Sequence, residues 1–116
     1  VNTENEIFDC RKDILLGDTC ANGYQLRPHI VWFGEAVPLL ENAIKITEKA
    51  DCLIIIGTSM QVYPAASLID FVSADTPIYF VDPKPAISSD ERRNLTVISE
   101  NAVIGVPTLV ASLIDR

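Results

Sequence analysis

The hydrophobic positions in the second part of the chain gather in three short runs, at residues 52–57, 77–82 and 95–99. Each run is rich in β-branched or aromatic residues and is bounded by polar residues, glycine or proline, a pattern typical of β-strands. The first run, CLIIIG, is continuously apolar, which predicts a strand of a parallel sheet that is covered on both faces. The other two runs predict further strands.

Between these runs the hydrophobic spacing changes to that of helices. A proline opens a segment whose apolar positions follow the i, i+3, i+4, i+7 rule, which predicts a helix over residues 38–50. The pattern also predicts a short helix over residues 65–72 and a helical turn over residues 88–93. Pro107 suits the first turn of a last helix that runs to about residue 114.

This order of elements predicts an α/β fold, with a partial parallel sheet of about three strands that is flanked by helices. Residues 1–25 have no such pattern and predict an irregular segment, apart from a second region at residues 26–116. Three strands are half of an ordinary doubly wound sheet. They either pair with further strands of the same chain or leave an exposed edge through which copies of the chain would associate. We expect the first in the natural protein, since a chain that begins with Val suggests a piece of a longer one.

Charge and composition narrow the class of partner. The net charge of −7 argues against nucleic acid, whose binding depends on lysine and arginine, and would instead attract lysine-rich peptides. No apolar run approaches the ~20 residues that a membrane-spanning helix needs. The first residues, VNTENEIFDC, do not resemble a signal peptide. Three cysteines without close pairs fit a reducing compartment, so we expect a cytoplasmic protein.

Candidate chemistry lies where the predicted strands end, because ligands of open α/β sheets bind at the carboxyl ends of the strands. Gly57, Thr58 and Ser59 follow the first strand, Asp82 ends the second, and Ala102 follows the third. Taken singly, Gly-Thr-Ser is also ordinary turn chemistry, and an aspartate before proline also starts turns. Together, two hydroxyls, a carboxylate and a small residue on successive strand ends predict one side of a nucleotide cleft. The G-x-G-x-x-G fingerprint is absent from the chain.

Three motifs in order, LRPHIVWFGEAVP, IIIGTSMQVYPAASL and VDPKP, resemble the C-terminal half of a sirtuin. Sirtuins are the NAD-dependent protein-lysine deacylases of the silent information regulator family, and the chain is most similar to bacterial members. The resemblance covers residue 25 to the end. It implies that residues 26–116 are the C-terminal half of a Rossmann-like NAD-binding domain. Residues 1–25 would then be a remnant of the small, zinc-module-like subdomain.

The resemblance also implies where an acylated lysine of a protein would bind. The V-x-F-G-E motif of the family matches Val31, Phe33, Gly34 and Glu35, where the substrate peptide adds as an extra strand. The carbonyl of Val31 would receive the amide hydrogen of the acyl-lysine, and Val31 and Phe33 would line the tunnel for its aliphatic stem. Val62 takes the tunnel position on the opposing segment. Main-chain pairing of this kind gives affinity with little sequence selectivity.

For NAD, the resemblance implies a set of contacts at the strand ends. Gly57, Thr58 and Ser59 match residues that hold NAD ribose. Asp82, with Pro83 after it, stands at the adenosine ribose where the family most often has Asn, and Ala102 lies near the adenine ring. The reaction that the family performs releases nicotinamide and passes the acyl group to ADP-ribose.

Two family features are missing from the chain. The general base is a histidine in a Gln-Asn-x-Asp-x-x-His stretch, which this chain lacks, and the Gly-Ala-Gly-x-Ser phosphate loop is absent as well. His29, the only histidine, is therefore not expected to be catalytic. We expect no catalytic residue in this chain, an inert fragment when isolated, and a need for the N-terminal half. The alternatives are a catalytically dead module that binds peptides or a partner, and a nucleotide-binding half of a different transferase.

Zinc is the other departure from the family. Many sirtuins carry two C-x-x-C pairs, the second just before L-R-P, but here Gly17 stands where the first cysteine of that pair would be. Cys20 remains, and Cys10 is too distant in sequence to restore the pattern. Since a structural zinc site needs four ligands, we expect no metal site and a segment 1–25 that is held by packing.

Overall fold

A computed structural model describes residues 7–115 of the chain. The chain divides into two compact units, Val1–Ala36 and Val37–Arg116, which we describe separately. Residues 1–6 of the predicted irregular segment lie outside the described residues. The predicted boundary after residue 25 rests on the sequence pattern and stays a prediction.

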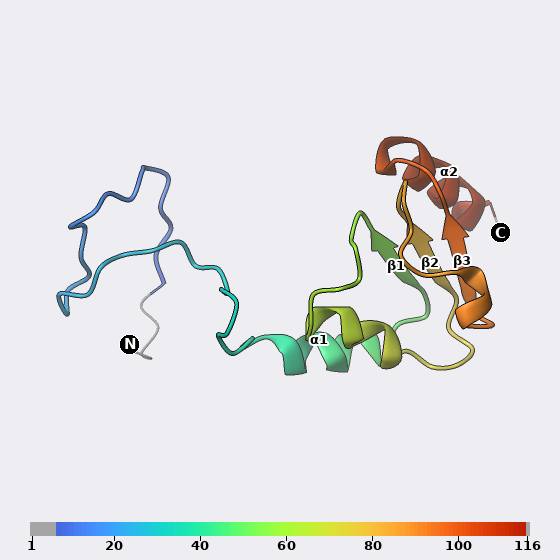
Figure 1. Ribbon diagram of the computed structural model, residues 1–116, viewed down its shortest axis with the longest axis horizontal. Coiled ribbons are helices and arrows are strands. Elements are labelled where there is room, and N and C mark those ends of the chain that lie inside the picture. The colour runs from blue at the N-terminus through green and yellow to red at the C-terminus, as the bar shows by residue number, and fades with distance from the viewer. Residues whose placement is uncertain (1–6, 116) are drawn as a thin grey trace. The chain divides into compact units, whose positions relative to one another are not determined.

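The second unit contains a three-stranded parallel sheet in the order β1-β2-β3. Its strands are β1 (Leu53–Ile56), β2 (Ile78–Val81) and β3 (Leu95–Ile98), and Figure 1 shows their arrows pointing the same way. Each strand lies inside one of the three apolar runs of the sequence. The predicted α/β class and the partial parallel sheet are thereby confirmed.

The core is built on both faces of the central strand β2, all of whose residues are buried. Because side chains alternate along a strand, Ile78 and Phe80 point to one face and Tyr79 and Val81 to the other. The first face packs against Ile69, and the second against the helix α2 (Ala102–Ile114). Ile78, Phe80 and Val81 have no exposed surface, which places the centre of the core at β2.

The prediction that β1 is covered on both faces is wrong for the described residues. Ile54 and Ile56 are 37% and 44% exposed, while Leu53 and Ile55 face the core. In register, Ile54 and Ile56 lie beside the β2 residues that α2 covers. The helix packs over β2 and leaves these two β1 side chains open. An apolar run therefore predicts a strand, but it does not show whether a neighbouring element covers each of its side chains.

The helices differ from the sequence prediction mainly in their bounds. Helix α1 covers Leu40–Thr47, and two 3-10 helices follow, η1 (Ala65–Asp70) and η2 (Ser89–Glu91). Helix α2 begins at Ala102, five residues before Pro107, so the prediction that Pro107 lies in its first turn is wrong. The helix starts earlier because the chain leaves β3 in extended conformation at Asn101, whose carbonyl then accepts the N–H groups of Ile104 and Gly105.

The described part of the first unit, residues 7–36, has no helix and no strand beyond one isolated bridge between Thr19 and Gln25. Polar bonds hold it. The Gln25 amide accepts from Gly17 N at 2.7 Å and donates to the carbonyls of Leu15 and Leu26. Leu15 and Leu16 are 64% and 99% exposed. We expected packing to hold this segment, but in the structure a hydrogen-bond network around the Gln25 side chain holds it.

Candidate functional site

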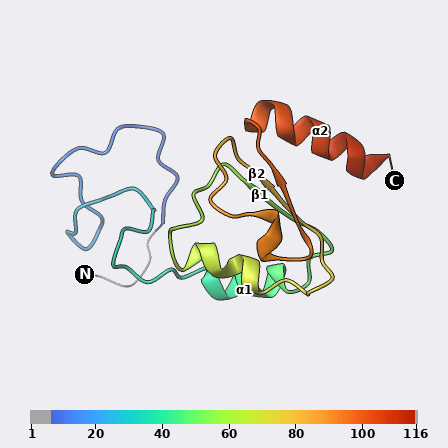
Figure 2. The same ribbon diagram turned by 45° about the vertical axis from the view of Figure 1, so that its right-hand side comes forward.

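The carboxyl ends of the three strands meet at one edge of the sheet. Gly57 N donates to Val81 O at 2.9 Å, and Asp82 N donates to Ile98 O at 3.2 Å, so the parallel pairing continues just past each strand. The loops that begin at Gly57 and Asp82 therefore leave from neighbouring positions. Figure 1 shows the three strands side by side, and α2, labelled in both views (Figure 2), follows β3 in the chain.

The loop after β1 offers open backbone. Gly57 has a φ of +61°, and a Cβ placed on it would have no heavy atom within 4 Å. Thr58 Oγ1 accepts a hydrogen bond from Met60 N at 3.2 Å, which fixes the turn, and Ser59 is exposed. A left-handed glycine with free space beside it, followed by two hydroxyl residues, fits the approach of a sugar or phosphate oxygen.

The loop after β2 is organised by Asp82. Its Oδ1 accepts a hydrogen bond from Lys84 N at 2.7 Å, closing an Asx turn over Pro83. This is the turn-starting role that the sequence left open. A carboxylate has two oxygens and several lone pairs, so the same half-buried side chain also fits the acceptance of a ribose hydroxyl.

Gly105, which sequence reasoning missed, brings α2 close to the strand ends. A Cβ on Gly105 would lie 2.7 Å from Val81 Cγ1 and 3.3 Å from Ile98 Cγ2. Only a residue without a side chain lets the first turn of the helix approach β2 and β3 this closely. Ala102, at the start of the helix, is exposed. The sequence did contain a signal for this contact, because a glycine in the first helical turn after a strand allows close packing of the helix against the sheet.

The predicted substrate segment lies in the first unit and is not a strand. Glu35 N donates to Trp32 O at 3.1 Å, which closes a turn over Phe33 and Gly34. Gly34 has a φ of +87°, the left-handed conformation that glycine adopts without strain at this point of a turn. Phe33 is 93% exposed and Val31 is 48% exposed, so both side chains face solvent.

Glu35 is held by its own segment. One carboxylate oxygen, Oε2, accepts from Trp32 N at 3.0 Å and from Arg27 Nη2 at 3.2 Å, and Oε1 lies 3.1 Å from the same Arg27 nitrogen. The backbone N–H of Trp32 is the main cause that lowers the pKa of Glu35. Desolvation opposes this and raises the pKa, while the hydrogen bond and the positive charge of Arg27 lower it further.

Val62 lies in the other unit, between β1 and η1. It is 54% exposed, and its carbonyl accepts from Ala66 N at 2.9 Å. Val31 and Val62 belong to different units, so their place on either side of one bound peptide stays a prediction.

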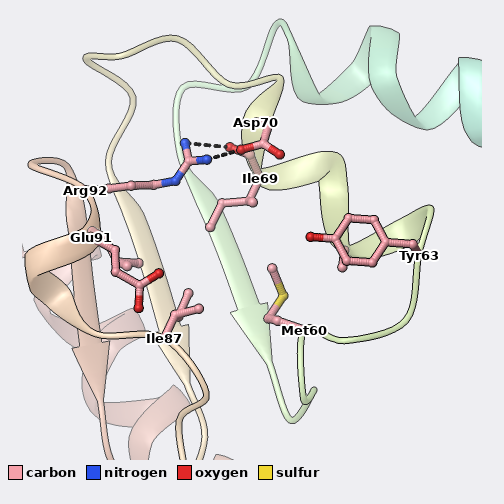
Figure 3. Close-up of a pocket in the computed structure, with 9 residues that line it drawn as sticks. Met60, Tyr63, Ile69, Asp70, Ile87, Glu91 and Arg92 are labelled. Carbon is pink, nitrogen blue, oxygen red and sulfur yellow. Dashed lines mark hydrogen bonds and ion pairs between the residues drawn. The ribbon is translucent and has the colours of Figure 1, made fainter.

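A separate pocket of about 170 Å³ lies on the sheet face that packs against η1 (Figure 3). Two of its charged groups pair with one another: Arg92 contacts Asp70 and also donates to Ile69 O at 3.2 Å. The third, Glu91, accepts a hydrogen bond from Ser88 N. No predicted site residue lines it, although Met60 adjoins Ser59. The lining residues are Met60, Tyr63, Ala66, Ile69, Asp70, Ile87, Glu91, Arg92 and Leu95.

Across residues 7–115, no group of three or more His, Cys, Asp or Glu side chains could hold a metal ion. Cys10 is exposed and donates to Lys12 O, and Cys20 is half-buried. His29 is exposed. Over the same residues, no helix is long and apolar enough to cross a membrane.

Comparison with known proteins gives a consistent result. The family model described as "Sir2 family" matches residues 2–64. A Helicobacter pylori protein named NAD-dependent protein deacylase is 49% identical over 111 residues, which are 96% of this chain and 48% of the relative. Proteins with the same name from Bacteroides thetaiotaomicron and Mycobacterium tuberculosis are 46% and 39% identical, over 88% and 81% of this chain and 43% and 40% of theirs. The chain thus spans about half the length of the curated relatives it matches. No solved structure matches it.

Proposed function

The chain belongs to the Sir2 family, and from this premise we propose that it forms part of an enzyme that removes acyl groups from protein lysines and consumes NAD. The observation that carries the proposal is the edge where the β1 and β2 exits and the start of α2 converge, in a chain whose relatives are named deacylases. An open α/β sheet binds its ligand at such an edge.

We assign NAD to that edge. The backbone at Gly57 is open to a ligand, and Thr58 and Ser59 offer hydroxyls beside it. Asp82 and Pro83 form the neighbouring turn, and Ala102 starts the helix that Gly105 brings close. NAD, when bound, supplies the ADP-ribose that receives the acyl group and the nicotinamide that leaves.

We assign the acyl-lysine peptide to the segment from Val31 to Glu35, with Val62 as the opposing tunnel residue. Support comes from the exposure of Val31 and Phe33, whose apolar side chains would contact the aliphatic part of an acylated lysine. A neutral acyl-lysine loses less on leaving water for such a contact than a charged lysine does.

No residue of this chain is assigned as the general base. The chain has no Gln-Asn-x-Asp-x-x-His stretch, and His29, its only histidine, follows Leu-Arg-Pro instead. We propose that the isolated chain is inactive and that activity needs the remaining half of the family fold. In the three-stranded sheet β1 has a free edge, which supports an extension of the sheet there by that half or by a second copy of the chain. The exposed side chains of Ile54 and Ile56 leave one face of the same strand open to be covered.

A second candidate function is a peptide- or partner-binding module without catalysis. The observation that favours it is the same free edge of β1 together with the missing base motif. It differs from the first candidate in one measurable respect, since such a module would bind an acetyl-lysine peptide without needing or consuming NAD.

The assignment of NAD is tested with a hybrid deacylase, in which this chain replaces the 111 matched residues of the Helicobacter pylori protein. Replacing Ser59 with Ala removes one hydroxyl at the proposed ribose contact. We expect NAD to bind about three- to tenfold more weakly by calorimetry, which is the loss of one hydrogen bond. Ser73→Ala, in a turn away from this edge, is the matched control. Equal NAD affinity in the Ser59 variant and the parent hybrid would contradict the assignment.

A further inference from the structure

The segment that precedes and includes the proposed peptide-binding turn is fixed by one carboxylate. Glu35 receives the N–H of Trp32 and the guanidinium of Arg27 at 3.0–3.2 Å. The ion pair joins the two ends of a nine-residue stretch, 27–35, while the bond to Trp32 fixes its last turn. We call these three residues the Arg27–Trp32–Glu35 clamp.

Little else holds this stretch. Every residue from 27 to 36 is exposed, and none belongs to a helix or strand. The remaining backbone bonds within it are short-range, from Ile30 N to Pro28 O at 2.9 Å and from Glu35 N to Trp32 O. A segment with few buried contacts opens at low free-energy cost unless polar groups fix it. The clamp supplies that fixation.

The direction of the Trp32 bond bears on how a peptide would pair. When a peptide pairs with an extended backbone, the N–H and C=O of one residue point to one side and those of the next residue to the other. Val31 and Trp32, which precede the turn, would therefore direct their polar groups to opposite sides. Glu35 occupies the Trp32 N–H and therefore satisfies the side away from the peptide. The Val31 carbonyl, which the proposed function assigns to the substrate, accepts no backbone hydrogen bond from any of the residues 7–115.

We propose that Arg27 and Glu35 are positioning residues for the acyl-lysine peptide: the carboxylate of Glu35, oriented by Arg27, holds Trp32 N–H so that the carbonyl of Val31 is presented to the peptide. The inference rests on the proposed function and gives Glu35 a role through the backbone rather than through contact with the substrate. Preorganisation of a binding segment lowers the entropic cost of binding. The clamp therefore acts on peptide affinity, and neither on NAD affinity nor on the chemical step.

Glu35→Ala in the hybrid deacylase removes the acceptor. We expect the KM for an acetyl-lysine peptide to rise about five- to tenfold, with the KM for NAD and kcat each within about twofold. Asp75→Ala breaks another exposed ion pair, Asp75–Arg93, and is the matched control. A general loss of stability would lower the amount of folded enzyme and therefore the apparent kcat, whereas loss of positioning raises the peptide KM.

Two further variants separate the backbone bond from the charge pair. Glu35→Gln keeps a side-chain oxygen for Trp32 N–H, so we expect it to retain most of the peptide affinity. The exchange Arg27→Glu with Glu35→Arg restores opposite charges but puts a residue without an acceptor at position 35, so we expect no rescue. In amide NMR of the chain itself, the Trp32 N–H should exchange with solvent faster in Glu35→Ala than in Glu35→Gln.

The outcomes are distinct. An active hybrid whose Glu35→Ala variant keeps the parental peptide KM overturns the clamp alone. Rescue by the exchanged pair also overturns it, because charge would then suffice. A parent hybrid that folds and binds NAD but does not deacylate overturns the proposed function, and the clamp's role with it. Selective loss of peptide affinity, with rescue by glutamine, supports both.

Discussion

Glu35 shows how a single exposed carboxylate can order a loop that has no core beneath it. Its oxygens accept from one backbone N–H and one guanidinium, and both donors stabilise the charged form. The pKa of Glu35 is accordingly lowered, first by the Trp32 N–H and then by Arg27. A carboxyl whose pKa is lower in the folded state stabilises that state above its unfolded pKa. The contribution is lost as the pH falls through the lowered, folded pKa.

This predicts acid opening of the segment at a pH below the ordinary pKa of a glutamate. Trp32 is the only tryptophan, so its fluorescence and its amide shift report the clamp directly. We expect a titration of the Trp32 signal with a midpoint lower than that of the same segment in a short unfolded peptide. In Glu35→Gln this transition should vanish, which separates it from other carboxylates. A midpoint equal to that of the peptide would show that the clamp does not favour the ionised form.

At the scale of elements, the approach of α2 to the sheet depends on Gly105. The side chain that a larger residue would strike is Val81, which has no exposed surface and a stiff β-branched χ1. Helix propensity favours alanine over glycine by about 1 kcal/mol, while overpacking costs about 1–3 kcal/mol. With Val81 unable to move aside, overpacking decides the sign.

We therefore expect Gly105→Ala to lower the free energy of unfolding by up to about 2 kcal/mol, measured by urea denaturation. The double variant with Val81→Ala removes the methyl group in conflict, so its loss should be smaller than the sum of the two single losses. Additive losses, or a gain in stability from Gly105→Ala, would contradict the close packing of α2.

Much of this element structure was predictable from the sequence, for identifiable reasons. Runs such as residues 52–57 are rich in β-branched residues and are bounded by polar residues, glycine or proline, so the positions of all three strands could be predicted from them. Pro107 misled because proline is favoured in the first turn of a helix and disfavoured in its interior, whereas here it lies inside the helix. The decisive feature was the extended Asn101. The exposure of Ile54 and Ile56 could not be predicted, because an apolar sequence does not show which other elements cover a strand.

The candidate site divides in the same way. Residues at strand ends, such as Gly57 and Asp82, were found because topology brings successive strand ends to one edge. The pairing of Arg27 with Glu35 was not, because a separation of eight residues in an irregular segment matches neither helical nor strand periodicity. Only coordinates show which polar side chain closes such a loop.

At the scale of the whole molecule, a hydrogen-bond network around Gln25 holds the segment in which the sequence predicts no zinc site. We expect the purified chain to contain far less than one zinc per molecule by atomic emission, and EDTA to leave its thermal unfolding unchanged. Gln25→Ala should loosen this segment in amide exchange, because it removes three hydrogen bonds at once. Stoichiometric zinc, or unfolding on chelation, would show that cysteines hold the segment instead.

We have proposed that this chain supplies the dinucleotide edge and the peptide segment of an NAD-dependent deacylase. The most direct test is to measure nicotinamide release and peptide deacylation together in the hybrid with the Helicobacter pylori protein, using an acetyl-lysine peptide. The account predicts one nicotinamide for each acetyl group removed, with both rates reduced together in Ser59→Ala at limiting NAD. Peptide binding by a folded hybrid without any release of nicotinamide would contradict it.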